Sequence, residues 1–382
     1  MLRIPHLGQF LAFSAIGTVT LMSLLVLPAM IGVLVDNAGM SDSSAGWSAS
    51  ANFLAAAIIG LLISVRIHRL NLRQVATIAL AVAAVADLLS AFTAGEVPVF
   101  FAARILAGCA LGAAYVAAVS SFARYDEFER GFGLYVTMQF IVSGLGLYVV
   151  PVYADEIGAV GLFSGFAVLD CLALLLARTL PNEKASEKAT AESGSELKIL
   201  LTVSAALAIF GFAAFEAANN AQFTYIERFG VSLGISDHKV GFSLLIASLI
   251  GIPGAFCIVI VGQRFGTLLP LVVGMLIALA GLAILLSAES YAAYFIGSCC
   301  MGFSWAFCLP FIQSLLATID RKGSAIAAGT SFSTFGSAIG PGIAALVVTG
   351  GRYPNVFLLS IGLFIVTLVA FVYADRARRA KR

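Results

Sequence analysis

Long apolar stretches fill most of this 382-residue chain, and only short polar breaks separate them. Splitting the sequence at those breaks leaves twelve segments of about 20 residues or more, the length at which a helix crosses the hydrocarbon core of a bilayer. Hydrophobic residues make up 60% of the chain and charged residues only 11%. The pattern predicts an integral membrane protein, and an all-α one, since lipid offers an open backbone no hydrogen-bond partners.

The twelve predicted spans fall into two groups of six, and we place their ends to within about four residues. In the first half the expected ranges are 9–35, 44–65, 74–94, 98–121, 132–153 and 158–178. In the second half they are 198–223, 239–262, 268–288, 291–316, 324–349 and 354–374.

The longest polar stretch, residues 178–198, lies between the two groups. It contains Pro181 and alternating Lys and Glu residues, a composition typical of a solvated connector. We therefore expect a six-helix bundle over residues 1–178, a linker over 179–197 and a second bundle over 198–382. Small features of the first half recur in the second, as after duplication of one bundle. The predicted fold is twelve transmembrane helices in two pseudo-symmetric six-helix bundles.

The basic residues predict the orientation of these spans. Eighteen of the 22 Lys and Arg residues fall at the two termini, in the linker, or in loops on the same side as them. The opposite loops hold only Arg228, Lys239 and Arg352. Since basic loops stay on the cytoplasmic side, we expect both termini and the linker to be cytoplasmic. The sequence contains no Asn-x-Ser/Thr sequon, which favours a bacterial inner membrane.

Ionisable residues inside the spans are the first candidates for function, because a charge at the bilayer centre costs about 2.5–3.5 kcal/mol or more. Asp87 and Arg104 lie at similar depths in the third and fourth spans. Their pairing would either only neutralise both charges or contribute to coupling. Asp170 lies in the middle of the sixth span. We interpret Asp36, at the outer end of the first span, as an ordinary acidic residue at the membrane interface.

Glu216 is the sharper candidate. Asn219 and Asn220 follow it at i+3 and i+4, so the three polar side chains share one helical face. Such a face suits a water-filled cavity that binds substrate or protons; the alternative is an interhelical hydrogen-bond cluster near the outer surface. Further possible ligands could equally be packed or hydrogen-bonded within the bundle: Tyr115, Gln139, Ser243, Trp305 and Gln313.

Motifs of enzymes and metal sites are absent from the sequence. We find no HExxH, no GxSxG, no Gly-rich phosphate loop and no paired-cysteine metal motif. The six cysteines all lie in apolar segments, where a thiol packs as a small apolar group. We therefore expect no enzymatic activity, cofactor or metal, and no nucleic-acid partner.

Local motifs accompany the layout of six spans, a loop and six spans. In the fourth span Arg104 is followed by Gly108 and Gly112. The eleventh span contains Gly336, Gly340, Pro341 and Gly342, and basic turns with Arg66, Arg69 and Arg264 follow the second and eighth spans. With these features the chain resembles the major facilitator superfamily of secondary transporters over essentially its whole length. The first motif is similar to the family's Arg-centred motif, the second to its glycine–proline bending motif, and the turns to its gating loops.

The resemblance implies a monomeric carrier that works by alternating access around a central site. It implies that the seventh span, with Glu216, lines the cavity. It also implies that the sixth span is peripheral, so for Asp170 we favour a role in helix packing over contact with substrate. Gating or bending roles would fall to Arg66, Arg69, Arg264, Gly336, Gly340 and Pro341.

The predicted function is secondary active transport of a small organic solute, coupled to protons because Glu216 and Asp87 are titratable and no sodium-cage cluster is apparent. Arg104 would present a positive group and Glu216 a negative one. A membrane-embedded sensor or scaffold with the same fold is the alternative; a channel would need a continuous polar lining. The expected partners are the solute, protons and membrane lipid. Solute, direction of transport and stoichiometry stay open.

Overall fold

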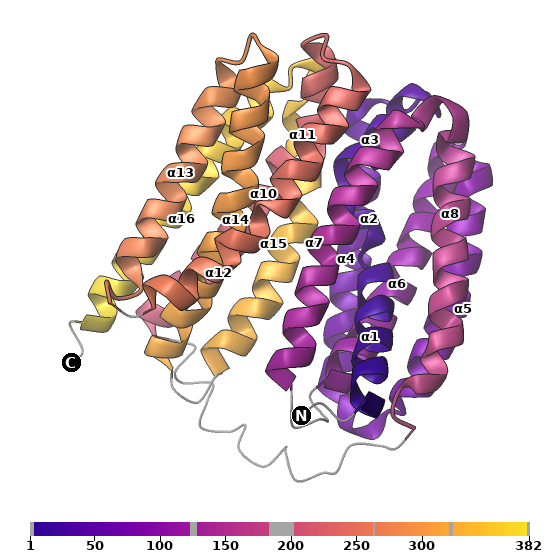
Figure 1. The fold of residues 1–382 in the computed structure, drawn as a ribbon, viewed down its shortest axis with the longest axis horizontal. Coiled ribbons are helices and arrows are strands. Elements are labelled where there is room, and N and C mark those ends of the chain that lie inside the picture. The colour runs from indigo at the N-terminus through magenta and orange to yellow at the C-terminus, as the bar shows by residue number, and fades with distance from the viewer. Residues whose placement is uncertain (1–3, 123–127, 183–201, 263, 321–323, 380–382) are drawn as a thin grey trace. The chain divides into compact units, whose positions relative to one another are not determined.

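The computed structural model describes residues 4–122, 128–182, 202–262, 264–320 and 324–379 (Figure 1). Within these ranges all regular secondary structure is helical. Ten helical segments of the described residues are long and apolar enough to cross a membrane, and shorter apolar helices accompany them. The prediction of an all-helical, multi-pass membrane protein is confirmed.

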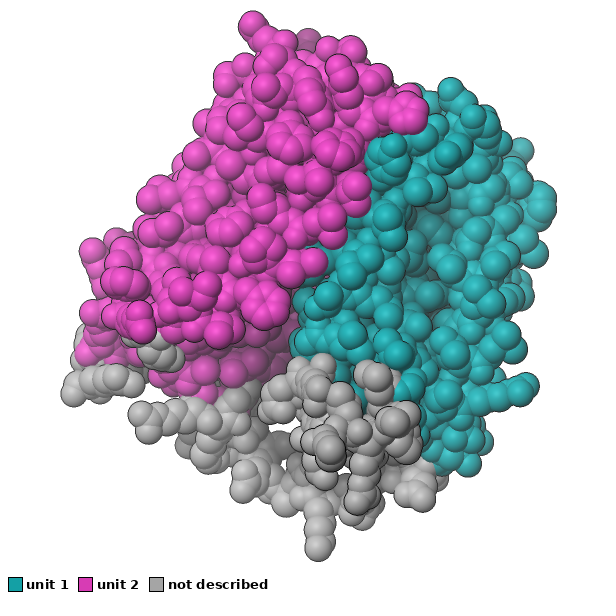
Figure 2. Space-filling view, in the orientation of Figure 1, with its two compact units in different colours: residues 1–188 teal, residues 189–382 magenta. Residues whose placement is uncertain are grey.

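The chain divides into two compact units, residues 1–188 (unit 1) and 189–382 (unit 2), which are coloured separately in Figure 2. Beyond Asn182, the predicted linker (residues 179–197) lies outside the described residues. Its boundaries, and those of the predicted bundles, therefore stay predictions.

Unit 1 is built from helices whose core contacts join sequence-distant segments. Helix α6 packs against α4 and α5, while α5 also packs against α8. Phe13, Phe122 and Tyr135 belong to one buried cluster that joins α1, α6 and α7. The elements are α1 (Ile4–Val19), α2 (Met22–Leu25), α3 (Leu27–Asp36), α4 (Asp42–Arg66), η1 (Ile67–Arg69), α5 (Leu72–Thr93), α6 (Val97–Phe122), α7 (Phe128–Val152), α8 (Ala154–Leu176) and η2 (Ala177–Thr179).

The first predicted span, 9–35, is wrong as a single helix, because the chain breaks it into α1, α2 and α3. Pro28, in the first turn of α3, has no N–H, so it cannot donate to the Leu24 carbonyl as a continuous helix would require. At the earlier break, the Thr20 hydroxyl donates to the Gly17 carbonyl at 2.8 Å and offers the backbone a local alternative.

The contact between α6 and α4 depends on glycine. A Cβ added at Gly108 would lie 2.1 Å from the carbonyl oxygen of Asn52, and one at Gly112 would lie 2.3 Å from that of Ala56. The Asn52 amide donates to the Arg104 carbonyl at 2.7 Å across the same contact. In the motif that follows Arg104, the two glycines thus let the backbones approach closely.

Unit 2 is arranged around α10, which packs against α15 and α16, while α14 packs against α11, α12 and α13. The elements are α10 (Val203–Ser232), α11 (Asp237–Leu249), α12 (Gly251–Val261), α13 (Leu268–Leu286), α14 (Tyr291–Ile319), α15 (Ser324–Val347), η4 (Thr349–Gly351) and α16 (Pro354–Arg379). The break between α11 and α12 falls at Ile250, three residues before Pro253.

Helix α10 corrects the predicted end of the seventh span at residue 223, since it continues to Ser232. The polar run does not end the helix, because its side chains bond to their own backbone. The Asn219 amide donates to the Phe215 carbonyl at 2.9 Å, and the Thr224 hydroxyl donates to the Asn220 carbonyl at 2.5 Å. Arg228, expected in a loop on the side opposite the linker, therefore lies within α10, next to Glu227.

Candidate functional site

Glu216 lies near the middle of the 30-residue helix α10 and is 6% exposed. Its Oε1 accepts a hydrogen bond from the indole Nε1 of Trp305 on α14 at 3.2 Å. Its Oε2 accepts one from the hydroxyl of Ser337 on α15 at 3.0 Å. A third, longer contact to Oε2 comes from the amide of Asn220 at 3.4 Å. Three helices of unit 2 thus meet at one carboxyl group, which we call the Glu216 cluster.

The close approach of α15 to α10 places Ser337 within reach of Glu216. A Cβ at Gly336 would lie 2.1 Å from the Ala213 carbonyl oxygen, and one at Gly340 would lie 2.8 Å from the Asn220 Cβ. The two glycines flank Ser337 and allow the helices to touch. The predicted bending motif is therefore also a packing motif; Pro341 lies inside α15, one residue after Gly340.

The two asparagines have different surroundings, although both are buried. The Asn220 amide donates to the Glu216 main-chain carbonyl at 3.0 Å as well as contacting its carboxyl group. The Asn219 amide donates to Phe215 of its own helix. Of the predicted pair, Asn220 joins the cluster directly, and Asn219 lies one position before it on the same helix.

The donors to the Glu216 carboxyl group are all neutral: an indole, a hydroxyl and an amide. Hydrogen bonds to a charged group contribute about 1.5–3 kcal/mol each, which offsets part of the cost of burying the charge. Neutral donors do not cancel the charge itself. A proton or a cationic ligand group at Glu216 would.

In unit 1 the predicted pair of Asp87 and Arg104 is present. Arg104 Nη2 donates to Asp87 Oδ1, and its Nε donates to the Ser90 hydroxyl at 2.9 Å. The guanidinium carbon lies 4.7 Å from the ring centre of Phe163 on α8, close enough for a cation–π interaction. Asp87 and Arg104 are each 1% exposed, so both charges are fully buried within unit 1.

Two other predicted ligands of unit 1 meet through a tyrosine. The Gln139 amide donates to the Tyr135 hydroxyl at 2.7 Å, and the Tyr115 and Tyr135 side chains share a hydrogen bond. Tyr115 is therefore connected to α7, on which Tyr135 and Gln139 lie one turn apart.

The remaining predicted residues lie apart from these clusters. Ser243 donates to the Lys239 carbonyl of its own helix, and Gln313 is exposed. The residues predicted to gate from the basic turns are exposed: Arg66 and Arg69 end α4 and η1, and Arg264 lies in the turn between α12 and α13.

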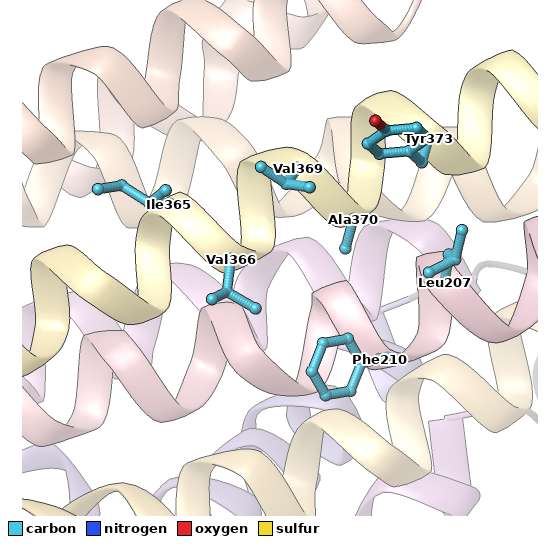
Figure 3. Close-up of a pocket in the computed structure, with 7 residues that line it drawn as sticks. All are labelled: Leu207, Phe210, Ile365, Val366, Val369, Ala370 and Tyr373. Carbon is cyan, nitrogen blue, oxygen red and sulfur yellow. The ribbon is translucent and has the colours of Figure 1, made fainter.

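An open groove of about 290 Å³ runs along α10 and α16 of unit 2 (Figure 3). Its walls carry no charged or amide side chain, and the Glu216 cluster is not part of it. The lining residues are Leu207, Phe210, Ile365, Val366, Val369, Ala370 and Tyr373. A polar solute would find no partner in this groove except the Tyr373 hydroxyl.

Sequence reasoning missed three residues of these clusters. Ser337 stands between Gly336 and Gly340, and recognising that stretch as a helix contact would have pointed to it. Ser90 follows Asp87 by three residues, and Tyr135 precedes Gln139 by four, so each shares a helical face with a residue that was predicted.

Comparison with known proteins adds to this geometry. No curated protein matches the sequence. Two solved structures of the nucleoside transporter NupG, one of them a variant, share the fold with TM-scores of 0.80 and 0.74 at 14% and 16% identity. Each match covers 96% of this chain and 99% of NupG.

A bacterial homologue of the human lysosomal transporter Spinster, in an inward-facing and unoccupied conformation, matches with a TM-score of 0.74 at 14% identity. This match covers 99% of this chain and 98% of the homologue. The family model of the Major Facilitator Superfamily matches residues 8–319, well over half of the sequence. The predicted family is thus confirmed: this chain belongs to the Major Facilitator Superfamily.

Proposed function

We propose that this protein is a proton-coupled secondary active transporter of a small polar organic solute, and that Glu216 binds both solute and proton. The observation that carries the proposal is the Glu216 cluster itself. A carboxyl group buried near the middle of a membrane-spanning helix is held by three neutral donors from α10, α14 and α15. An ionisable group in such a position is a functional-site hypothesis by default, because burying it in a membrane-spanning bundle is costly.

The chemistry of the cluster suits an exchange between proton and solute. When Glu216 is ionised, Trp305 and Ser337 direct their hydrogens at it. When Glu216 is protonated, the charge that attracts these donors is gone, and they become available to a solute. Proton binding and solute binding at one carboxyl group are thereby linked, as coupled transport requires.

The charges at the Glu216 cluster and at the Asp87–Arg104 pair favour a neutral or cationic solute over an anionic one. Arg104, expected to present a positive group, is buried inside unit 1 and paired with Asp87. The three donors described at Glu216 include no cation, and the ring of Trp305 beside it can stack on a planar or cationic group. Nucleosides are the first class to test, because the fold matches that of the nucleoside transporter NupG.

We propose the full twelve-span architecture on the same grounds. Ten segments of the described chain qualify as spans alone. The broken run α1–α3 and the glycine-rich α15 would supply the other two. Alternating access would then be a movement of two six-helix bundles, with Arg66, Arg69 and Arg264 at its cytoplasmic gate and Gly340 and Pro341 permitting α15 to bend. Both termini would face the cytoplasm of a bacterium, and the carrier would act as a monomer.

The test uses purified protein in liposomes loaded with a pH-sensitive dye, to which radiolabelled uridine is added. We expect uridine uptake to be accompanied by a change in internal pH, acidification for symport or alkalinisation for antiport. Glu216→Gln should abolish the pH change, because the amide cannot exchange a proton. Glu227→Gln is the matched control, since Glu227 is also a buried acid of α10.

Three results would contradict parts of the proposal. Unchanged proton movement in Glu216→Gln would show that another group carries the proton. Transport of a non-nucleoside found by screening, with no uridine uptake, would reject the nucleoside class only. Absence of transport across a broad solute screen, with folded protein, would favour the sensor alternative.

A further inference from the structure

Asp170, for which the sequence favoured a packing role, lies at the Asp87–Arg104 pair. Its carboxyl group interacts with that of Asp87 through a side-chain hydrogen bond and through charge, and it also feels the charge of Arg104. The packing of α8 agrees with this placement. Helix α5 packs against α8, and Phe163 of α8, two turns before Asp170, covers the Arg104 guanidinium.

The resulting cluster has two carboxyl groups and one guanidinium. Asp87, Arg104 and Asp170 are each 1% exposed. Besides the groups already paired, two polar atoms of the cluster have no hydrogen-bond partner, Asp170 Oδ2 and Arg104 Nη1. One carboxyl oxygen of the cluster, Asp170 Oδ2, is therefore free to carry or accept a proton.

Charge decides how such a cluster can exist. If both carboxyl groups were ionised, the cluster would carry a net charge of −1 inside a membrane-spanning bundle, and two like charges would repel at contact distance. A hydrogen bond between two carboxyl groups needs a proton on one of them. With that proton present, one carboxylate balances Arg104 and the cluster is neutral.

We propose that Asp87 and Asp170 share one proton, and that with Arg104 they form a proton-binding site inside unit 1, separate from Glu216. This site goes beyond the proposed function, because it stands on the geometry of unit 1 and does not require Glu216 to bind anything. The proton belongs to the pair, as in other coupled carboxyl groups, and not to one residue alone. Asp170 is thus a proton ligand in addition to a packing residue.

Other charged groups lie away from the pair. In the described part of the helices around the cluster, the remaining charged side chains are in the first or last turn of their helix: Asp36, Asp42, Arg66, Arg73, Asp155 and Glu156. Cys171, next to Asp170 in the sequence, is exposed and therefore points away from the cluster. Asp87, Asp170 and Arg104 are the groups that set the charge of the site.

Infrared spectroscopy tests the proposal without any transported solute. Protein produced with carboxyl-labelled ¹³C-aspartate is measured at neutral pH, so that the C=O band of a protonated aspartic acid is separated from bands of glutamic acid, Glu216 included. We expect the wild type to show this band and Asp170→Asn to lose it, because the remaining Asp87–Arg104 pair is neutral without a proton. Asp87→Asn should lose the band for the corresponding reason.

Asp375→Asn provides the control. Asp375 is buried too, but it accepts from Arg378 at 2.5 Å and from Arg379 at 2.7 Å, so guanidinium groups already balance its charge and it needs no shared proton. The wild-type band should persist in this variant. Absence of the band in the wild type would overturn the proposal even if a variant failed to fold. Persistence of the band in folded Asp170→Asn and Asp87→Asn would overturn it as well.

Discussion

Replacing Gly336 by alanine tests how the Glu216 cluster is built. The added Cβ would lie 2.1 Å from the carbonyl oxygen of Ala213, and its next neighbours are also backbone atoms of that residue. A backbone cannot rotate aside as a side chain can. Since carbon and oxygen approach comfortably only to about 3.3–3.6 Å, α15 must shift from α10 by about 1.2–1.5 Å. The hydrogen bond from Ser337 to Glu216, now 3.0 Å long, would then be lost.

The expected loss of stability has three parts. Forcing a methyl group into a packed contact costs about 1–3 kcal/mol. A lost interhelical hydrogen bond in a membrane protein costs about 0.6–1.7 kcal/mol. The better helix propensity of alanine returns about 1 kcal/mol. We therefore expect Gly336→Ala to lower the free energy of unfolding of unit 2 by about 0.5–4 kcal/mol, from the sum of these terms.

Gly362→Ala is the matched control, because Gly362 lies in α16 of the same unit and a Cβ added there would meet nothing within 4 Å. This variant should gain up to about 1 kcal/mol from helix propensity alone. Thermal unfolding in detergent can be followed by the added reaction of buried Cys308 with a thiol-reactive dye, above the signal of exposed Cys171. Equal melting temperatures of the two alanine variants would refute the close-contact argument.

Two further substitutions separate neighbouring contributions. Trp305→Phe keeps an aromatic ring but removes the Nε1 donor that lies 3.2 Å from Glu216. We expect the KM for the transported solute to rise about tenfold, which corresponds to a loss of about 1.4 kcal/mol of binding free energy. An unchanged KM in uptake assays would show that Trp305 does not bind the solute. Tyr135→Phe removes the hydroxyl that joins Gln139 to Tyr115, so the free energy of unfolding should fall by about 0.6–1.7 kcal/mol. A melting temperature equal to that of the wild type would show that these hydrogen bonds make no net contribution to stability.

The sequence predicted the existence and type of most helices because apolar length alone identifies a span. It also placed Asp87 opposite Arg104, since adjacent antiparallel spans bring residues of equal depth together. It could not predict that Asp170 joins them, because that depends on which face of α8 packs against α5. The end of α10 was missed for a local reason: asparagine and threonine bonded to their own helix look like loop residues in a sequence.

The hydrogen bonds and ion pair described at Glu216 and at Arg104 each join residues of one unit. Glu216 finds its donors on helices of unit 2, and Arg104 finds Asp87 and Ser90 on a helix of unit 1. A bond that spanned the two units would have to break whenever they moved against each other, and breaking a buried contact of this kind is costly. Contacts confined to one unit impose no such barrier. In the proposed alternating movement, the hydrogen bonds described at Glu216 and at Arg104 would therefore not have to break because one unit moves against the other.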